Sequence, residues 1–145
     1  MKERFKLSKA DPKAYEAMLG LEKYIAESGL DKKLYELIKT RASQINGCAY
    51  CINMHVRDAM REGEIAQRLF LLDAWRETDL YTEKERAVLA LTEAMTLIAG
   101  NPVSDEIYDE AKKHLTDKEL AAVIMSVVAI NGWNRIAITS RTPLD

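Results

Sequence analysis

The chain has 145 residues, which is most simply one domain, large enough to bury a core of its own. Apolar residues make up 48% and charged residues 30% of the sequence, as in an ordinary soluble globular protein. The formal net charge is only -2, and like charges form no block. Such a chain has no general attraction to polyanions, so we expect neither nucleic acid nor a membrane as a partner.

We expect neither a signal peptide nor a membrane-spanning helix in this sequence. The N-terminal residues lack the unbroken apolar stretch of a signal peptide. The longest apolar run, Leu120 to Ile130, is shorter than the roughly 20 residues of a spanning helix. We therefore expect one cytoplasmic domain over residues 1–145, with an N-terminal arm at 1–11 and a C-terminal tail at 140–145. A reducing cytosol disfavours a lasting structural disulfide.

The first half of the chain reads as helices separated by glycines. Asp11-Pro12 predicts a helix start, and that helix runs to Gly29. A second helix covers residues 31 to about 45. Its apolar stripe consists of Leu34, Leu37, Ile38, Arg41 and Ile45. Asn46-Gly47 interrupts the pattern, so a third helix begins at or just after Gly47.

The second half continues in the same way. A short fourth helix is expected over 63–75, a fifth over 82 to about 99, a sixth over 105–115 and a seventh over 117 to about 138. Thr82 and Glu85 match a capping box, and Ser104 and Thr116 are the caps of the next two helices. The expected core positions of the fifth helix are Ala87, Ala90, Leu91, Ala94 and Ile98. No alternating strand is bounded by hairpin turns, so the fold class is all-α with about seven helices. The last helix is apolar over much of its circumference, which predicts a central position or an oligomer contact.

One stretch, NGCAYCINMH at 46–55, holds both cysteines and one of the two histidines. On a helical wheel, Cys48, Cys51 and His55 occupy an arc of about 60° at one border of the apolar face. A thiol in the first turn of a helix is favoured as thiolate by the partial positive charge there. His55 lies one turn beyond Cys51 and can exchange a proton with it. The pattern therefore favours redox chemistry.

Other uses of these residues remain open at this point. The cysteines could be small buried apolar residues. A metal-binding or sensor module could use Cys48, Cys51 and His55, although a tetrahedral zinc site needs a fourth ligand. The second histidine, His114, is expected near the C-terminal end of a helix, interacting with its dipole. Covalent haem attachment is excluded because Ile52 follows the second cysteine, and a thioredoxin-like unit would need strands.

Taken together, RASQINGCAYCINMHVRDAMREGE, ERAVLALTEAMT and NGWNR resemble the alkylhydroperoxidase D-like proteins of the carboxymuconolactone decarboxylase superfamily. The likeness extends from about Leu34 to Arg135. It includes a glutamate twelve residues before the first cysteine and a histidine four residues after the second. In this chain these are Glu36 and His55. The fuller members also carry a histidine just before the second cysteine, where this chain has Tyr50.

The resemblance implies a helical bundle that assembles as a homo-oligomer, a trimer or a hexamer, and acts in antioxidant defence as a thiol peroxidase or as a dithiol/disulfide oxidoreductase. Cys51 would attack a small organic hydroperoxide, and Cys48 would donate a proton and then close the redox-active disulfide Cys48–Cys51. His55 and Glu36 would form the proton relay. No cofactor beyond the disulfide and no metal is implied, and a thiol or dithiol reductant protein would reopen it.

Four residues outside the Cys-X-X-Cys stretch lead to further expectations. The wheel of the second helix places Glu36 with Lys39 and Ser43, away from the apolar stripe, so Glu36 could instead be an ordinary solvated residue. Arg41 lies within that stripe and should have an acidic partner, Glu93 or Glu36. Trp133 and Asn134 could line a pocket near the thiols. The remaining alternative for the whole chain is a helical oligomerisation module with inert thiols.

Overall fold

The computed structural model describes residues 1–144, and its regular elements are helices throughout, with no strand among these residues. In chain order they are α1 (Leu7–Ala10), α2 (Pro12–Glu27), α3 (Lys32–Asn46), α4 (Ala49–Arg61), α5 (Ala66–Phe70), the 3-10 helix η1 (Leu72–Glu77), α6 (Glu83–Thr96), α7 (Asp105–His114) and α8 (Asp117–Ser140). The all-α prediction is confirmed. The short helix α1 lies within the expected N-terminal arm, and Asp145, at the end of the expected tail, lies outside the described residues.

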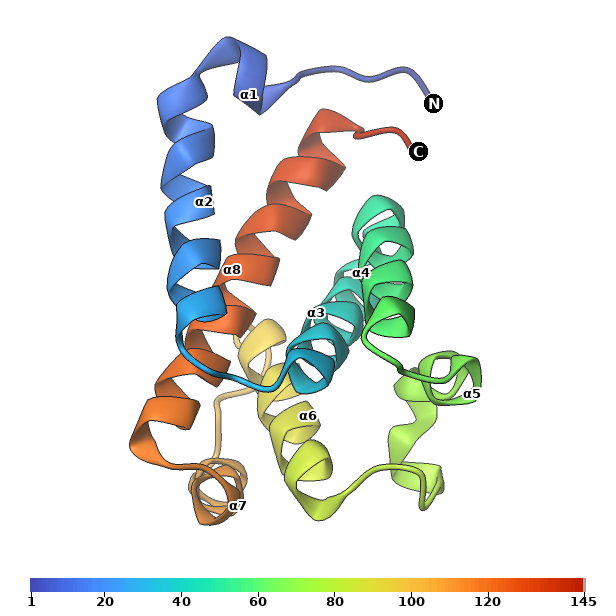
Figure 1. The fold of residues 1–145 in the computed structure, drawn as a ribbon, viewed down its shortest axis with the longest axis vertical. Helices are drawn as coiled ribbons and strands as arrows, with labels where there is room; N and C mark the ends of the chain where they lie inside the picture. Colours follow the sequence, from blue (N-terminus) through green and yellow to red (C-terminus); the bar gives the residue numbers. More distant parts are fainter. Residues whose placement is uncertain (145) are drawn as a thin grey trace.

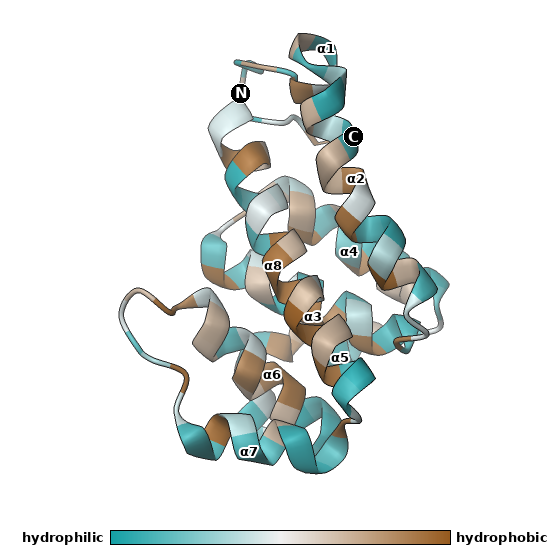
Figure 2. Ribbon diagram, turned by 90° about the vertical axis from the view of Figure 1, so that its left-hand side faces the viewer, coloured by the Kyte–Doolittle hydropathy of each residue, from teal (hydrophilic) through white to brown (hydrophobic). Residues whose placement is uncertain are grey.

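The longest helix, α8, runs along most of the molecule with α2 beside it (Figure 1). Helix α3 packs against α4, α6 and α8, and α7 packs against α6. Apolar residues are concentrated where α3, α6 and α8 meet, while α7 is mostly hydrophilic (Figure 2). The two ends of the chain lie on the same side of the bundle, and the backbone N–H of Arg4 donates to the carbonyl of Ser140 at 2.9 Å.

Short polar residues start the main helices where the sequence predicts it. Thr82 and Thr116 each form a complete capping box, in which the hydroxyl accepts from a backbone N–H and a glutamate side chain accepts in return. The side chains of Asp11, Asp31 and Ser104 accept backbone N–H groups in the same way. Each such cap stabilises its helix by about 1 kcal/mol. Apart from the fourth helix, which is expected from residue 63 and begins at Ala66, the helix starts read from the sequence are confirmed to within two residues.

The expected fourth helix is divided, and the physical reason lies in its apolar spacing. Leu69, Leu72 and Trp75 are all buried and follow one another at intervals of three residues. On a continuous α-helix these three positions would spread over an arc of about 120°, whereas the observed path, α5 followed by η1 with non-helical dihedrals at Ala74, buries all three. The chain accordingly leaves the α conformation after Phe70 and continues as η1. The expected core residue Ile98 was also wrong: α6 ends at Thr96, and Ile98 is exposed.

Helix α8 has the central position expected of it. Val123, Val127 and Ile130 are almost completely buried. Within residues 1–144 it is also the one helix long and apolar enough to cross a membrane by length and composition alone. Its contacts with α2, α3, α6 and α7 are those of a core helix.

Candidate thiol-disulfide site

A turn at Gly47, between α3 and α4, places the first cysteine at the start of α4. Gly47 adopts a positive φ of 69°, a conformation that glycine reaches without steric cost, and it ends α3. The N–H of Gly47 donates to the carbonyl of Gln44, and the N–H of Cys48 donates to that of Ser43. The chain thereby reverses within two residues. Cys48 becomes the N-cap of α4, and Cys51 falls in its first turn.

A buried polar network holds this turn against α8. The side-chain amide of Asn46 donates to Asn131 at 3.0 Å and to Asn134 at 2.9 Å. Asn134, which is fully buried, donates in turn to the hydroxyl of Ser43 at 2.9 Å. The expectation that Asn134 lines a pocket was therefore wrong, because its polar atoms are used to fix the turn that carries Cys48.

The two cysteines form a disulfide, Cys48–Cys51, with their Cα atoms 5.3 Å apart. The Sγ of Cys48 also accepts from the backbone N–H of Cys51 at 3.4 Å. Both residues are 2% exposed and pack on Ala42 of α3 and on Ile130 and Ala137 of α8. They are the centre of the buried face of α4, not its border as the wheel suggested. The reason is that α4 is covered by α3 and α8 on that side.

Glu36 and His55 are paired beside the disulfide. The Nδ1 of His55 lies 2.8 Å from Oε2 of Glu36, and both side chains are buried. The opposite ring nitrogen, Nε2, is buried without a hydrogen-bond partner. The alternative reading of Glu36 as a solvated residue was wrong. Helix α3 is enclosed by α4 and α8 as well as by α6, so the second face of α3, with Glu36 and Lys39, is also buried.

A cleft of about 530 Å³ reaches this pair. Cys51 lines it together with Glu36 and His55, whereas Cys48 is not among its lining residues. Tyr50 and Trp133 form part of its aromatic wall. The expectation for Trp133 is thus confirmed. Of the two cysteines, Cys51 is therefore the one that borders the cleft.

A second polar group lies on the wall of the same cleft and was missed by the sequence analysis. The carboxylate of Glu22, on α2, accepts from Lys39 at 2.5 Å, from the indole N–H of Trp133 at 2.8 Å and from the hydroxyl of Tyr35. Burial lowers the pKa of Lys39, although Glu22 opposes the change. Burial alone would raise the pKa of Glu22, but Lys39 and the other donors outweigh it and keep that pKa low. No sequence motif links α2 to these partners, so only the packing of α2 on α8 reveals the group.

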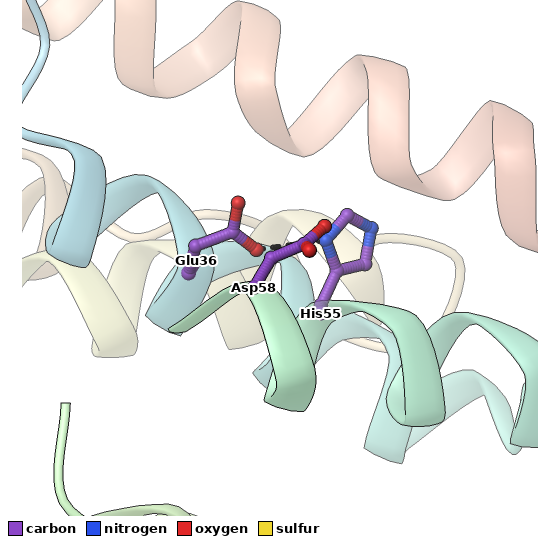
Figure 3. Close-up of side chains that lie close together, drawn as sticks. All are labelled: Glu36, His55 and Asp58. Carbon is purple, nitrogen blue, oxygen red and sulfur yellow. Dashed lines mark hydrogen bonds and ion pairs between the residues drawn. The ribbon is translucent and has the colours of Figure 1, made fainter. Parts of the chain in front are cut away.

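Glu36, His55 and Asp58 point toward one another (Figure 3), and their ligand atoms all lie within 4.8 Å of one another. Carboxylate and imidazole are groups that could hold a divalent cation. The metal-binding alternative read from the sequence used both cysteines instead. Because the disulfide leaves no thiolate to bind a metal, that alternative applies to the reduced chain alone. His114 lies at the end of α7 beside Glu110, away from this site, as expected.

Arg41 has the acidic partner that its position demanded. Its Nε donates to Glu93 at 2.8 Å, and Glu93 also accepts from the indole N–H of Trp75 and from Arg76. This group ties α3, α6 and η1 together.

Fold and site define an all-helical protein with a Cys-X-X-Cys disulfide at a helix start. The sequence model of the carboxymuconolactone decarboxylase family matches residues 12–94. YdfG of Bacillus subtilis (strain 168), an uncharacterized protein, is 40% identical over 138 residues, which is 95% of this chain and 94% of YdfG. The chain therefore belongs to the carboxymuconolactone decarboxylase family.

Solved structures agree with this assignment. A protein of unknown function from Agrobacterium tumefaciens, for which a role in antioxidant defence as an AhpD protein has been suggested, has a TM-score of 0.96. It is 40% identical, and the match covers 99% of both chains. The resemblance to AhpD-like proteins is thus confirmed. The debrominase Bmp8 has a TM-score of 0.85 at 21% identity, covering 94% of this chain and 74% of Bmp8, which shows a shared fold alone. The fold of this family thus carries enzymes.

Proposed function

We propose that this protein is a cytoplasmic thiol peroxidase that reduces small organic hydroperoxides with the Cys48–Cys51 pair. One observation carries the proposal: the disulfide lies at the start of α4, and Cys51 shares a cleft with a buried histidine–glutamate pair. A thiolate on Cys51 would be stabilised by the N-terminus of α4. The unpartnered Nε2 of His55 is the nearby group that could donate a proton to a reacting oxygen.

The chemistry balances with these residues alone. The Cys51 thiolate attacks the O–O bond, which breaks, so the sulfur becomes a sulfenic acid and the leaving alkoxide takes a proton from His55. The Cys48 sulfur then attacks Cys51, the S–S bond forms, and the expelled hydroxide takes the Cys48 proton as water. Thiol, thiolate, hydroperoxide and one proton thus give disulfide, alcohol and water. Because the resolving thiol is three residues away, the sulfenic acid is trapped before it is oxidised further.

Glu36 has a supporting role in this scheme. Its carboxylate accepts from Nδ1–H of His55, which orients the ring and stabilises the imidazolium, the form in which Nε2 also carries a proton. A thiol or dithiol reductant protein would return the disulfide to two thiols by exchange. Assembly as a trimer or hexamer remains part of the proposal.

Stopped-flow mixing of the reduced protein with cumene hydroperoxide tests the assignment. The wild-type protein should form the disulfide, and Cys51→Ser should lose the fast reaction. Cys48→Ser should keep the attack but stop at a sulfenic acid that dimedone labels on Cys51. Equal rates of peroxide consumption in wild type and Cys51→Ser would remove Cys51 from the attacking role and sink the proposal.

A further inference from the structure

Oxidation of the reduced protein by the hydroperoxide consumes one proton, and the residues that supply it are buried. Glu36 and His55 are 7% and 5% exposed. A substrate in the cleft would cover the approach to them from the side of Cys51. The proton must therefore reach the pair from another direction.

A second cleft, of about 520 Å³, lies on the other side of this pair. Four residues line both clefts and so form the wall between them: Glu22, Tyr35, Glu36 and Asp58. Cys51 and His55 line the first cleft and are not among the lining residues of the second. The second cleft thus offers solvent a route to the far end of the Glu36–His55 pair without passing the sulfur.

Of the four wall residues, Asp58 is the one suited to pass a proton. The Tyr35 hydroxyl holds its proton tightly, because burial and its hydrogen bond to Glu22 raise its pKa. Glu22 is engaged by three donors. Lys39, which faces the first cleft, is 1% exposed and bound to Glu22 at 2.5 Å, so it does not exchange with solvent.

Asp58, in contrast, is both exposed and close to the pair. Its side chain is 36% exposed and bound by Arg61 at 2.9 Å. Its carboxylate lies within 4.8 Å of the ligand atoms of Glu36 and His55 (Figure 3). That separation exceeds a direct hydrogen bond but is spanned by a single water molecule.

Building on the proposed function, we propose that Asp58 is a positioning residue that connects the Glu36–His55 pair to solvent through the second cleft. Substrate then enters on the Cys51 side and protons enter on the Asp58 side. The two routes stay separate, so the site can take up a proton while the hydroperoxide is bound. Asp58 acts through Glu36 and His55 and does not touch the reacting sulfur.

Four variants test this assignment by the rate of disulfide formation with cumene hydroperoxide across a pH series. Asp58→Asn should slow the reaction about tenfold and flatten its pH profile, because the amide carries no exchangeable acidic proton. Asp58→Glu should restore most of the rate, and added formate should rescue Asp58→Asn. Arg61→Gln, which removes the partner of Asp58 but keeps the carboxylate, should stay within about twofold of wild type.

Glu62→Gln is the matched control, since Glu62 lies at the rim of the second cleft and is 39% exposed, beside Lys32 at 3.7 Å. It removes the same charge from the same end of α4 and should change the rate by at most about twofold. A wild-type rate and pH profile in Asp58→Asn would overturn the inference. The inference would also be overturned if Asp58→Asn reacted slowly and its rate were not restored by formate, and if Asp58→Glu were equally slow, because the role of Asp58 would then be structural.

The thiolate absorbance of the reduced protein against pH separates this inference from the proposed function, because no peroxide is present. Asp58→Asn should move the midpoint to lower pH, since a negative charge near the thiols has been removed, and Glu62→Gln should not. If wild type and Cys51→Ser consumed peroxide equally, the proposed peroxidase function would be wrong. The shift of the thiolate midpoint would then still test whether Asp58 is coupled to the site, and an unchanged midpoint in Asp58→Asn would overturn the inference about Asp58.

Discussion

Helix α3 takes part in two carboxylate clusters on different sides, one around Glu93 of α6 and one around its own Glu36, and the two carboxylates have different kinds of partner. On the side of α6, Glu93 accepts from Arg41 at 2.8 Å, from Trp75 at 2.8 Å and from Arg76 at 2.6 Å. On the side of α4, Glu36 pairs with Nδ1 of His55 at 2.8 Å. The partners of Glu93 are permanent donors, whereas the partner of Glu36 is an imidazole, whose ring nitrogens can donate or accept.

We infer from this difference that the Glu93 group stabilises the fold and that the Glu36 group serves the reaction. The Glu93 group leaves its carboxylate fully engaged, as a charge that only stabilises the fold must be. The Glu36 group ends in an Nε2 without a partner, next to the cleft that Cys51 lines. An unused polar atom costs stability, so its retention fits a site that binds or protonates something else. Exchanging the two carboxylates for amides should therefore give opposite phenotypes.

The largest effect is expected for Glu36→Gln. Glutamine still bonds to His55 but cannot stabilise the charged ring, so peroxide-driven disulfide formation should fall about a hundredfold. The free energy of unfolding should change by less than about 1 kcal/mol, because the side chain keeps its shape and a partner. Stopped-flow rates and urea unfolding measure the two quantities. A variant with the wild-type rate would show that the pair is merely a buried ion pair.

The complementary change is Glu93→Gln. It weakens three charge-assisted hydrogen bonds between α3, α6 and η1, so the protein should lose about 2 kcal/mol of stability. Its reaction with cumene hydroperoxide should remain within about twofold of wild type at a temperature where it is folded. A large loss of rate in the fully folded variant would contradict the division between the two sides of α3.

Acid should weaken the fold in part through the Glu93 group. Burial alone would raise the pKa of Glu93, but hydrogen bonds from Trp75, Arg76 and Arg41 outweigh it and hold that pKa below its ordinary value of 4.5. The unfolded chain then binds the proton first, so the stability from Glu93 is complete above about pH 4.5 and is lost as the pH falls through the lower folded value. The urea midpoint of wild type should fall with acid in this range, and more steeply than that of Glu93→Gln. If the urea midpoints of wild type and Glu93→Gln fell in parallel as the pH is lowered, Glu93 would not contribute to the acid sensitivity.

Much of this arrangement follows from the sequence, because helix caps and glycine turns act locally. Thr82, Thr116 and Gly47 fix where helices begin and end through bonds to residues at most four positions away. The Cys-X-X-Cys spacing likewise places both sulfurs at one helix start. The pairing of Glu36 with His55 followed from family resemblance, since the wheel of α3 alone pointed it to solvent.

What the sequence could not supply depends on long-range packing. Lys39 and Glu22 are 17 positions apart, and Glu22 and Trp133 are 111 apart, and neither pair belongs to a periodic pattern. A wheel assumes that a helix has one buried face, and α3 has two because three helices surround it. The shared wall of the two clefts is a property of α2, α3 and α4 together.

The smallest expected effect concerns Tyr50, which lines the first cleft where fuller members of the family carry a histidine. A phenol has an ordinary pKa of about 10 and passes protons poorly near neutral pH, whereas an imidazole titrates there. Tyr50→His should therefore raise the rate with cumene hydroperoxide a few-fold near pH 7, with stopped-flow mixing as the measurement. Tyr50→Phe is the control and should not raise it. Because His55 already supplies a proton donor, the gain should vanish in Tyr50→His combined with Glu36→Gln if both histidines depend on the same carboxylate. If the double variant still reacted faster than Glu36→Gln alone, the added histidine would act independently of Glu36.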